Sequence, residues 1–548
     1  MTKGWIRKYR GFSASLAIAL LFWWGSAPGV ALASPPNILV AIADDQSFPH
    51  ASAYGFKGVQ TPAFDRVARA GVLFGNAFTP APGCSPMRAA FLTGRHIWQI
   101  EQAGTHASSF PTKYEVFPDR LERSGYVVGY TGKGWGPGNW EASGRTRNPA
   151  GPKFSSKTCE PPATGMATFD YAANFDEFLN TRSANEPFCF WFGSKEPHRK
   201  FEKGSGLKSG KSLRDVAVPP FLPDRPEIRS DILDYLLEIE WFDEHLGRML
   251  DNLEERGELE NTLVIVTSDN GMAFPRAKAN VYEYGIHMPL AVAWPKGFSG
   301  GRHVDDLVNL IDVTATLYEA TRVEPPFDYP LSGRSLMNVL LGQGSGVLDP
   351  TRDAVFSARE RHSSSRFNSL SYPQRSIRTH DYLYIWNLRP ERWPAGTPQK
   401  FETVNYDSTG EVIQGALGPV NGAYHDIDAC PSLSFMIEHR EDDSIRPFLE
   451  LAVARRPEFE LYDIRVDPGC LKNLAGKVSH RALEARLANR LQAHLRATGD
   501  ARIVGPNGGE IWETYPRYSS LRWFPTPDWV SRASLIQQDW LESRRPRQ

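Results

Sequence analysis

The chain has 548 residues, of which 41% are hydrophobic and 23% charged, and its 62 Lys and Arg nearly balance 63 Asp and Glu. This length exceeds one small core, so we expect a large domain with a smaller one, and the composition excludes a membrane bundle or a disordered chain. The balanced charge gives no global field that recruits nucleic acid or an anionic membrane, so any anion must be captured by a local site.

The first 33 residues have the pattern of a secretory signal peptide. Four basic residues within positions 1–10 precede an apolar stretch over residues 16–24, and Ala31-Leu32-Ala33 comes before Ser34. This order predicts export with cleavage near Ser34. The apolar stretch is well short of the roughly 20 residues that cross a bilayer, and no later stretch approaches that length. We therefore expect a mature chain without a membrane span, in a periplasm or outside the cell.

Two almost wholly apolar runs, over residues 37–43 and 262–267, are typical of strands buried on both faces of a parallel sheet. Both runs end in polar side chains: Asp44, Asp45, Asp269 and Asn270. Ligands of open α/β sheets bind beyond the carboxyl ends of the strands, so we expect these side chains to converge. Hard oxygen ligands suit Ca²⁺ or Mg²⁺ rather than zinc. A single Asp-Asp pair would more simply cap a turn, but two acidic strand ends favour a metal site.

The remaining elements predict an α/β fold with a large mixed, mostly parallel sheet sandwiched by helices. Residues 230–256 repeat apolar side chains near the helical period, between the two strands. After residue 345 the segments shorten, as at 382–386 and 459–462, before a helix-like stretch over 480–495. This change predicts a smaller α+β domain with an antiparallel sheet. The expected divisions are a signal peptide (1–33), a catalytic domain (34–345) and a C-terminal domain with its tail (346–548).

The chain has five cysteines, at Cys84, Cys159, Cys189, Cys430 and Cys470. No CxxC motif occurs, and no cysteine-histidine spacing suggests zinc. If Cys84 serves chemistry, the other four are an even number that allows two disulfides in an oxidising compartment. Their pairing does not follow from the sequence.

Cys84 begins the sequence Cys-Ser-Pro-Met-Arg, and Leu-Thr-Gly-Arg follows over residues 92–95. A cysteine near an arginine is usually a buried thiol or half of a disulfide. Here the spacing resembles the sulfatase motif Cys-x-Pro-x-Arg, in which a formylglycine-generating maturation enzyme oxidises the cysteine to formylglycine (3-oxoalanine). Cys84, Pro86 and Arg88 match the positions that this modification requires, while Met87 stands where many members have serine.

The resemblance extends from about residue 36 to residue 475, and it implies an alkaline phosphatase-like fold with one bound calcium ion. The implied calcium ligands are Asp44, Asp45, Asp269, Asn270 and the modified Cys84. The other matches are Lys133, which follows a strand over residues 126–131, then His198 after Pro197, and Lys278. Each of these three alone would be an ordinary surface or turn residue. Their order and spacing around Cys84 favour a common site.

The resemblance gives each residue a task. A hydroxyl of the hydrated aldehyde at Cys84 attacks sulfur beside the cation, and Arg88 holds this nucleophile. Calcium, Lys133, Lys278 and His198 match the negative charge of the sulfuryl oxygens. His198 or Lys278 protonates the leaving oxygen or nitrogen. The second hydroxyl then expels sulfate and restores the aldehyde.

Trp135 is a departure from the family pattern, because sulfatases commonly have histidine two residues after the matching lysine. Since indole cannot accept a proton, either another group regenerates the aldehyde or the site is reshaped for a particular substrate. His96 and His106 are the nearby candidates, although we expect a structural role for each. His287 stands where arginine is frequent, and no mechanism follows from it.

Within the family, the chain looks most like the heparan N-sulfatase (sulfamidase) branch, on the basis of residues 196–199, 268–275, 371–376 and 461–463. This predicts a sulfated saccharide substrate with an N-sulfoglucosamine end, and an O-sulfated polysaccharide is the alternative. Arg361, His362 and Arg375 are candidates for binding a sulfated sugar from the smaller domain.

Two other functions compete with the sulfatase prediction. A phosphate or phosphonate ester hydrolase of the same superfold with two metals would need further His and Asp ligands and a Ser or Thr nucleophile. A catalytically inactive binder of sulfated glycans is suggested by Trp135. Cys84 in the nucleophile position and what looks like a one-metal set disfavour the two-metal hydrolase, although the formylglycine motif also serves phosphate and phosphonate ester hydrolases. The intact set of Cys84, Pro86 and Arg88 disfavours the inactive binder.

Overall fold

The computed structural model describes Met1 and residues 35–183, 186–406 and 412–529, so the predicted signal peptide lies outside the described residues. Within these ranges, no helix combines the length and the apolar character needed to cross a membrane. The segment from Pro35 onward forms one compact unit, and the division predicted at residue 345 stays a prediction.

The central sheet contains eight strands among the described residues, in the order β3-β4-β1-β5-β6-β2-β7, with β8 beside β2. They are β1 (Asn37–Ala43), β2 (Val72–Phe78), β3 (Val127–Gly132), β4 (Phe188–Gly193), β5 (Thr262–Ser268), β6 (His287–Ala293), β7 (Arg302–Val304) and β8 (Val308–Asn309). All neighbouring pairs are parallel except those of β6, which runs antiparallel to both β5 and β2. The predicted mixed, mostly parallel sheet is confirmed.

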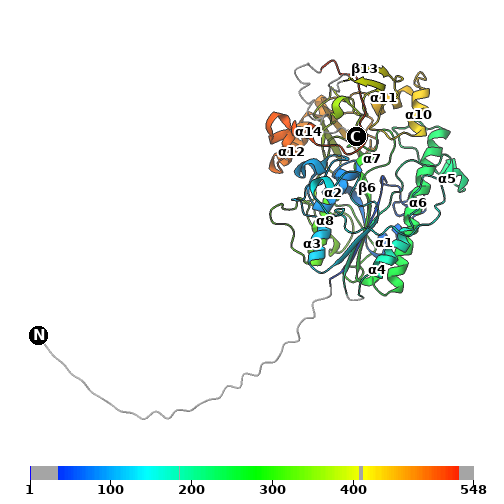
Figure 1. Ribbon diagram of the computed structural model, residues 1–548. Coiled ribbons are helices and arrows are strands. Elements are labelled where there is room, and N and C mark those ends of the chain that lie inside the picture. The colour runs from blue at the N-terminus through cyan, green and yellow to red at the C-terminus, as the bar shows by residue number, and fades with distance from the viewer. Residues whose placement is uncertain (2–34, 184–185, 407–411, 530–548) are drawn as a thin grey trace, which may run out of the picture. The chain divides into compact units, whose positions relative to one another are not determined.

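Helices cover both faces of this sheet (Figure 1). One face carries α2 (Cys84–Thr93), α3 (Phe117–Arg123) and α8 (Ile311–Thr321), and the other carries α1 (Pro62–Ala70), α4 (Tyr171–Leu179) and α6 (Pro226–Glu255). Alternate side chains of β1 enter the two hydrophobic cores, Val40 on the first face and Leu39 on the second. An apolar run without alternation is therefore what a central strand of this fold requires.

Helix α6 begins four residues before the predicted helix over 230–256, because Pro226 occupies its first turn. Proline suits this position, since its fixed φ is helical and its missing N–H would have no partner there. Short helices connect the remaining elements: α5 (Ser205–Lys208), α7 (Glu283–Ile286) and α9 (Met337–Leu340).

A second sheet is antiparallel and has the order β14-β11-β10-β9, as predicted. Its strands are β9 (Val355–Arg359), β10 (Gln374–Arg378), β11 (Tyr382–Asn387) and β14 (Phe459–Asp463), and β12 (Phe401–Tyr406) pairs separately with β13 (Val412–Leu417). The helices of this region are α10 (Pro431–Glu438), α11 (Arg446–Val453), α12 (Arg481–Ala497), α13 (Ala501–Val504) and α14 (Ile511–Thr514).

All five cysteines are free thiols in the structure, so the two disulfides that the even count allows are not formed. The physical reason is their distribution. Cys189, Cys430 and Cys470 are buried in three different hydrophobic clusters, and Cys159 packs against a fourth. Each thiol therefore serves as a small apolar side chain.

Candidate active site

The polar side chains that follow β1 and β5 meet at one edge of the central sheet. The two strands are parallel neighbours in register up to their last residues, so both chains leave the sheet at the same level. Asp45 N donates to Asp269 Oδ1 at 3.1 Å, and Asn270 Nδ2 donates to Asp45 Oδ1 at 2.7 Å. One oxygen from each of Asp44, Asp45 and Asp269 lies within 4.8 Å of the others. This set of hard oxygen donors can hold a divalent cation.

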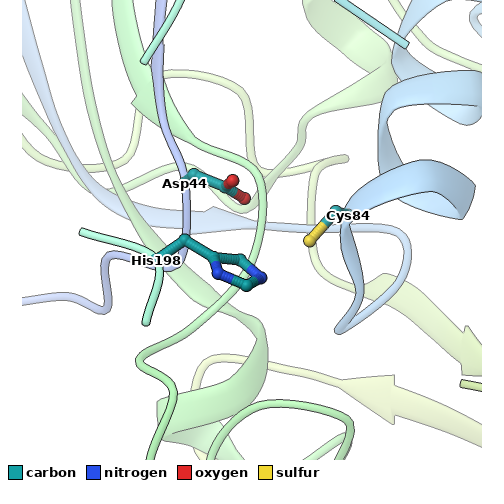
Figure 2. A group of neighbouring side chains, drawn as sticks. All are labelled: Asp44, Cys84 and His198. Carbon is teal, nitrogen blue, oxygen red and sulfur yellow. The ribbon is translucent and has the colours of Figure 1, made fainter. Parts of the chain in front are cut away.

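Cys84 is the first residue of α2 and is fully buried. Its Sγ, an Asp44 oxygen and a His198 ring nitrogen all lie within 4.8 Å of one another, and Figure 2 shows these side chains pointing toward a common space. Burial, followed by the negative charge of Asp44, raises the pKa of the Cys84 thiol well above its ordinary value. The unmodified thiol is therefore protonated at neutral pH, which makes it a poor nucleophile.

Arg88 lies one turn further along α2 and is also fully buried. Its Nε donates to Asp269 Oδ2 at 2.8 Å, and its Nη1 donates to the carbonyl oxygens of Lys133 and Gly134 at 2.7 and 3.2 Å. One guanidinium thus joins α2, the end of β5 and the loop after β3. Arg88 fixes the position of Cys84 relative to the carboxylates.

Three positively charged or basic side chains surround the carboxylates. Lys133 Nζ lies 2.5 Å from Asp44 Oδ2, and Lys278 Nζ lies 2.6 Å from Asp45 Oδ2. His198 Nδ1 donates to the carbonyl oxygen of its neighbour, residue 199, at 2.7 Å, so the ring presents Nε2 to the site, 3.9 Å from Asp45 Oδ2. The structure thus brings together all the residues that the sequence proposes for the site, and their roles stay predictions.

The charges in the site act on the pKa values of the carboxylates. Burial alone would raise the pKa of Asp44, but the positive charges of Lys133, His198 and Arg88 outweigh it and hold the pKa well below its ordinary value. Burial, followed by the negative charge of Asp44, raises the pKa of Asp269 to about 6. Asp269 thus retains a proton in mildly acidic solution, and a bound cation would have to displace that proton.

Asp428 is a site residue that the sequence does not reveal. It lies just before α10, and its Oδ2 is 3.0 Å from Lys278 Nζ. One of its oxygens lies within 4.8 Å of ligand atoms of Asp45 and His198. No motif surrounds Asp428 in the sequence, so only the fold brings it to the site.

Trp135 supports α2, the helix that begins at Cys84. Its Nε1 donates to the Ser85 carbonyl oxygen at 3.1 Å, and its buried ring packs edge-on against Phe110. Of the two substitute histidines, His96 lies 3.1 Å from His494, ring nitrogen to ring nitrogen, and stacks on Trp98.

His106 and His287 have partners of their own. His106 is half-buried and packs against the ring of His362, 4.7 Å between centroids. His287 stacks between Phe48 and Phe78, where its Nε2 bonds to the Gly75 carbonyl oxygen. These contacts give both rings a packing role.

Two of the three residues proposed for binding a sulfated sugar, Arg361 and Arg375, are engaged elsewhere. Arg375 is fully buried and its guanidinium pairs with Glu360 and Asp500. Arg361 donates to the carbonyl oxygens of Tyr515 and Pro516. His362 is buried against Gly83, where an added Cβ would approach its ring at 3.2 Å. The interpretation was wrong for Arg361 and Arg375, because the fold uses these two side chains to join the C-terminal segments. For His362, which lies beside the residue before Cys84, it stays a prediction.

Comparisons with known proteins agree with this geometry. The family described as Sulfatase matches residues 36–323, and the family described as N-sulphoglucosamine sulphohydrolase, C-terminal, matches residues 276–393. Human N-sulphoglucosamine sulphohydrolase is 28% identical over 515 residues, which cover 88% of this chain and 94% of the human protein. An ulvan-active sulfatase of Formosa agariphila is 26% identical over 476 residues, 86% of this chain and 82% of that protein.

The fold is also found among solved structures. A protein in complex with its substrate D-glucosamine-2-N,6-O-disulfate superposes with a TM-score of 0.58 and 20% identity, covering 85% of this chain and 99% of that protein. This likeness shows a shared alkaline phosphatase-like fold. Because the Sulfatase family matches more than half of the chain, the protein is a member of the sulfatase family and a hydrolase of sulfate esters or sulfamates.

Proposed function

We propose that this protein removes sulfate from a sulfated saccharide, with an N-sulfoglucosamine end as its substrate, by means of formylglycine made from Cys84 and one bound calcium ion. The observation that carries the proposal is the position of Cys84. It begins α2 within reach of the carboxylates at the ends of β1 and β5, and Arg88 locks it in place. A maturation enzyme would act on Cys84, and we expect the chain to be exported.

The donor set fits a calcium ion. Asp44 Oδ1 and Asn270 Oδ1 are buried and have no hydrogen-bond partner, although buried polar atoms are normally satisfied. Three carboxylates also converge within 4.8 Å. Such crowding of like charges is expected where a cation binds, and carboxylate and amide oxygens are the ligands that calcium prefers. We propose that Asp44, Asp45, Asp269 and Asn270 hold the ion, with the modified Cys84 as a further ligand.

When present, formylglycine would supply the oxygen nucleophile and calcium would supply positive charge beside the sulfuryl group. The chain's own residues do the rest. Lys133 and Lys278 place two ammonium groups where negative charge develops on the sulfuryl oxygens. His198, held by its Nδ1 bond, presents Nε2 on the open side of the site, where it can give a proton to the leaving oxygen or nitrogen. Lys278 is the other candidate for this proton transfer.

A two-metal phosphatase is the main competing function, because Asp45, His198 and Asp428 form a second group with metal-ligand spacing. Lys278 argues against a second ion there. Its ammonium lies 2.6 Å from Asp45 and 3.0 Å from Asp428, so a fixed positive charge already bridges these carboxylates. One metal and one bridging lysine therefore disfavour a two-metal phosphatase.

The substrate assignment follows the relatives. The human relative is named for N-sulphoglucosamine, and the family matched over residues 276–393 has the same name, which supports an N-sulfated sugar. The ulvan-active relative supports the alternative of an O-sulfated polysaccharide.

Sulfate release from a panel of substrates tests the proposal. Protein coexpressed with the maturation enzyme would be incubated with N-sulfoglucosamine, O-sulfated monosaccharides, and a matched aryl sulfate and aryl phosphate. We expect release from N-sulfoglucosamine and preference for the aryl sulfate over the phosphate. Activity on O-sulfates alone would overturn the substrate, and phosphate preference would overturn the reaction.

Mass spectrometry of the peptide containing Cys84 tests the modification directly. We expect formylglycine in coexpressed protein and cysteine in protein made without the enzyme. Unmodified cysteine in both preparations would favour an inactive glycan binder.

A further inference from the structure

The carboxylate of Asp428 is held firmly at the rim of the site. Two residues before it, Asp426 pairs with the buried guanidinium groups of Arg359 and Arg366. Four residues after it, Ser432 lies in the first turn of α10 and donates from Oγ to Asp231 Oδ2 at 2.6 Å. The segment between these anchors has little freedom, so the position of Asp428 is built into the fold.

Burial distinguishes the floor of the site from its opening. The Asp45 side chain is fully buried and that of Lys278 nearly so, whereas 29% of the Asp428 side chain and 35% of the His198 side chain are exposed. Asp428 and His198 have more exposed side chains than Lys133, at 15%, and Cys84 is buried, so we expect a substrate to enter past Asp428 and His198. The leaving sugar therefore lies against these two residues during the reaction.

Asp428 has spare capacity to accept hydrogen bonds. Its Oδ2 faces the Lys278 ammonium, and its Oδ1 has no protein partner among the described residues. An ionised carboxylate only accepts hydrogen bonds, so it attracts hydroxyl and amine groups and repels a second sulfate. Lys278 also pairs with Asp45, so it does not depend on Asp428 alone for its position. The proposed role of Lys278 on the sulfuryl group is therefore distinct from that of Asp428.

We propose that Asp428 determines specificity: it accepts a hydrogen bond from a free hydroxyl next to the scissile sulfate, and it rejects substrates with a second sulfate at that position. This inference rests on the proposed function, since it concerns the leaving sugar of that reaction. The enzyme would then act on a saccharide end whose neighbouring sulfate has already been removed. Another sulfatase must supply that substrate.

A matched pair of substrates tests the inference. For an N-sulfated substrate the pair is N-sulfoglucosamine and its 3-O-sulfated form, and an O-sulfated substrate from the panel would be paired in the same way. We expect the wild-type enzyme to favour the singly sulfated member. Asp428→Asn should raise KM for the singly sulfated member roughly 10- to 100-fold, which is the scale of losing a hydrogen bond to a charged group. The variant should also show a smaller difference in activity between the singly and doubly sulfated members. Asp443→Asn, an exposed carboxylate paired with Arg446, is the control and should change neither value.

The outcomes distinguish failure of the proposed function from failure of the inference. Absence of sulfate release by the wild-type enzyme from every substrate would overturn the proposed function. With activity present, equal use of both members by the wild type, or an equal loss on both in Asp428→Asn, would overturn the inference. A fall in calcium affinity in this variant would instead make Asp428 a metal ligand and also overturn it. Should Asp428→Asn fail to fold, equal use of both members by the wild type would still overturn the inference.

Discussion

The Arg88 guanidinium donates from Nε to Asp269 Oδ2 at 2.8 Å, and both side chains are fully buried. The same group bonds to the carbonyl oxygens of Lys133 and Gly134, so one side chain sets the relative positions of α2, the end of β5 and the loop after β3. Arg88 therefore holds the site together, in addition to being part of the motif for modification of Cys84.

Replacement of Arg88 by lysine should disable the site. Lysine lacks the planar fork, so it cannot bond to Asp269 and both carbonyl groups together. We expect kcat to fall at least about 100-fold, and stability to fall by about 3–5 kcal/mol if the buried charge pair is broken. Arg66→Lys is the matched control, because Arg66 pairs with Asp251 and Glu254 on the surface, where such pairs contribute less than about 1 kcal/mol. Sulfate release and thermal unfolding would measure both effects. Similar behaviour of the two variants would contradict the prediction.

Trp135 should be needed for the position of α2 and not for proton transfer. In Trp135→Phe the Ser85 carbonyl loses a hydrogen bond, which costs about 1 kcal/mol. In Trp135→His an imidazole would replace the indole in the packed space beside Phe110, so the histidine common in the family should not raise kcat. Thermal unfolding would measure the loss of stability in Trp135→Phe, and pH-rate profiles would measure kcat in Trp135→His. A gain in kcat for Trp135→His, with a new titration in the profile, would mean that position 135 faces the reaction.

Local sequence patterns predict the floor of the site, because its geometry follows from strand ends. The apolar runs locate β1 and β5 closely, and parallel neighbours necessarily bring Asp44 and Asp269 to the same edge. The helix that carries Cys84 and Arg88 is likewise short and local, so spacing along the sequence becomes spacing in the structure.

Contacts between distant segments explain what the sequence does not predict. Asp428 reaches Lys278 only because the ion pairs of Asp426 fold its loop across the site. The departure at Trp135 is visible in the sequence, but its bond to Ser85 depends on how the loop after β3 packs. Arg375 has the charge of a sugar-binding residue, yet the fold encloses it with Glu360 and Asp500.

Calcium affinity should weaken in acid because of Asp269. In the calcium-free protein its pKa is raised to about 6, chiefly by burial, so below that pH the carboxyl group carries a proton that calcium must displace. Above pH 7 the group is ionised and affinity should be constant, whereas below pH 6 it should fall by about tenfold per pH unit for one displaced proton. Calorimetric titration with calcium between pH 5 and pH 8 would measure this pH dependence of the affinity. Asp269→Asn should bind calcium weakly without this slope, and the same slope in the variant would assign the proton to another group.

The bidentate pair of Arg199 and Asp231 should stabilise the loop that carries His198. The two contacts are 2.7 and 2.9 Å, and Asp231 also accepts from Ser432 at the start of α10. Asp231→Asn leaves a buried guanidinium without its counter-charge, which should cost about 3–5 kcal/mol and lower kcat through displacement of His198. Asp224→Asn removes an exposed carboxylate from Arg229 and should cost less than about 1 kcal/mol. Equal thermal shifts in the two variants would contradict this account.

Thiol titration should report the state of every cysteine at once. All five are free in the structure, and three of them are buried in separate hydrophobic clusters where no other cysteine lies. Oxidation of Cys84 to formylglycine removes one thiol, so fully modified protein should show four thiols after denaturation without reductant, and Cys84→Ala should show the same four. Protein made without the maturation enzyme should show five. Two fewer thiols in every preparation, restored by reductant, would reveal a disulfide and require some of these clusters to be packed differently.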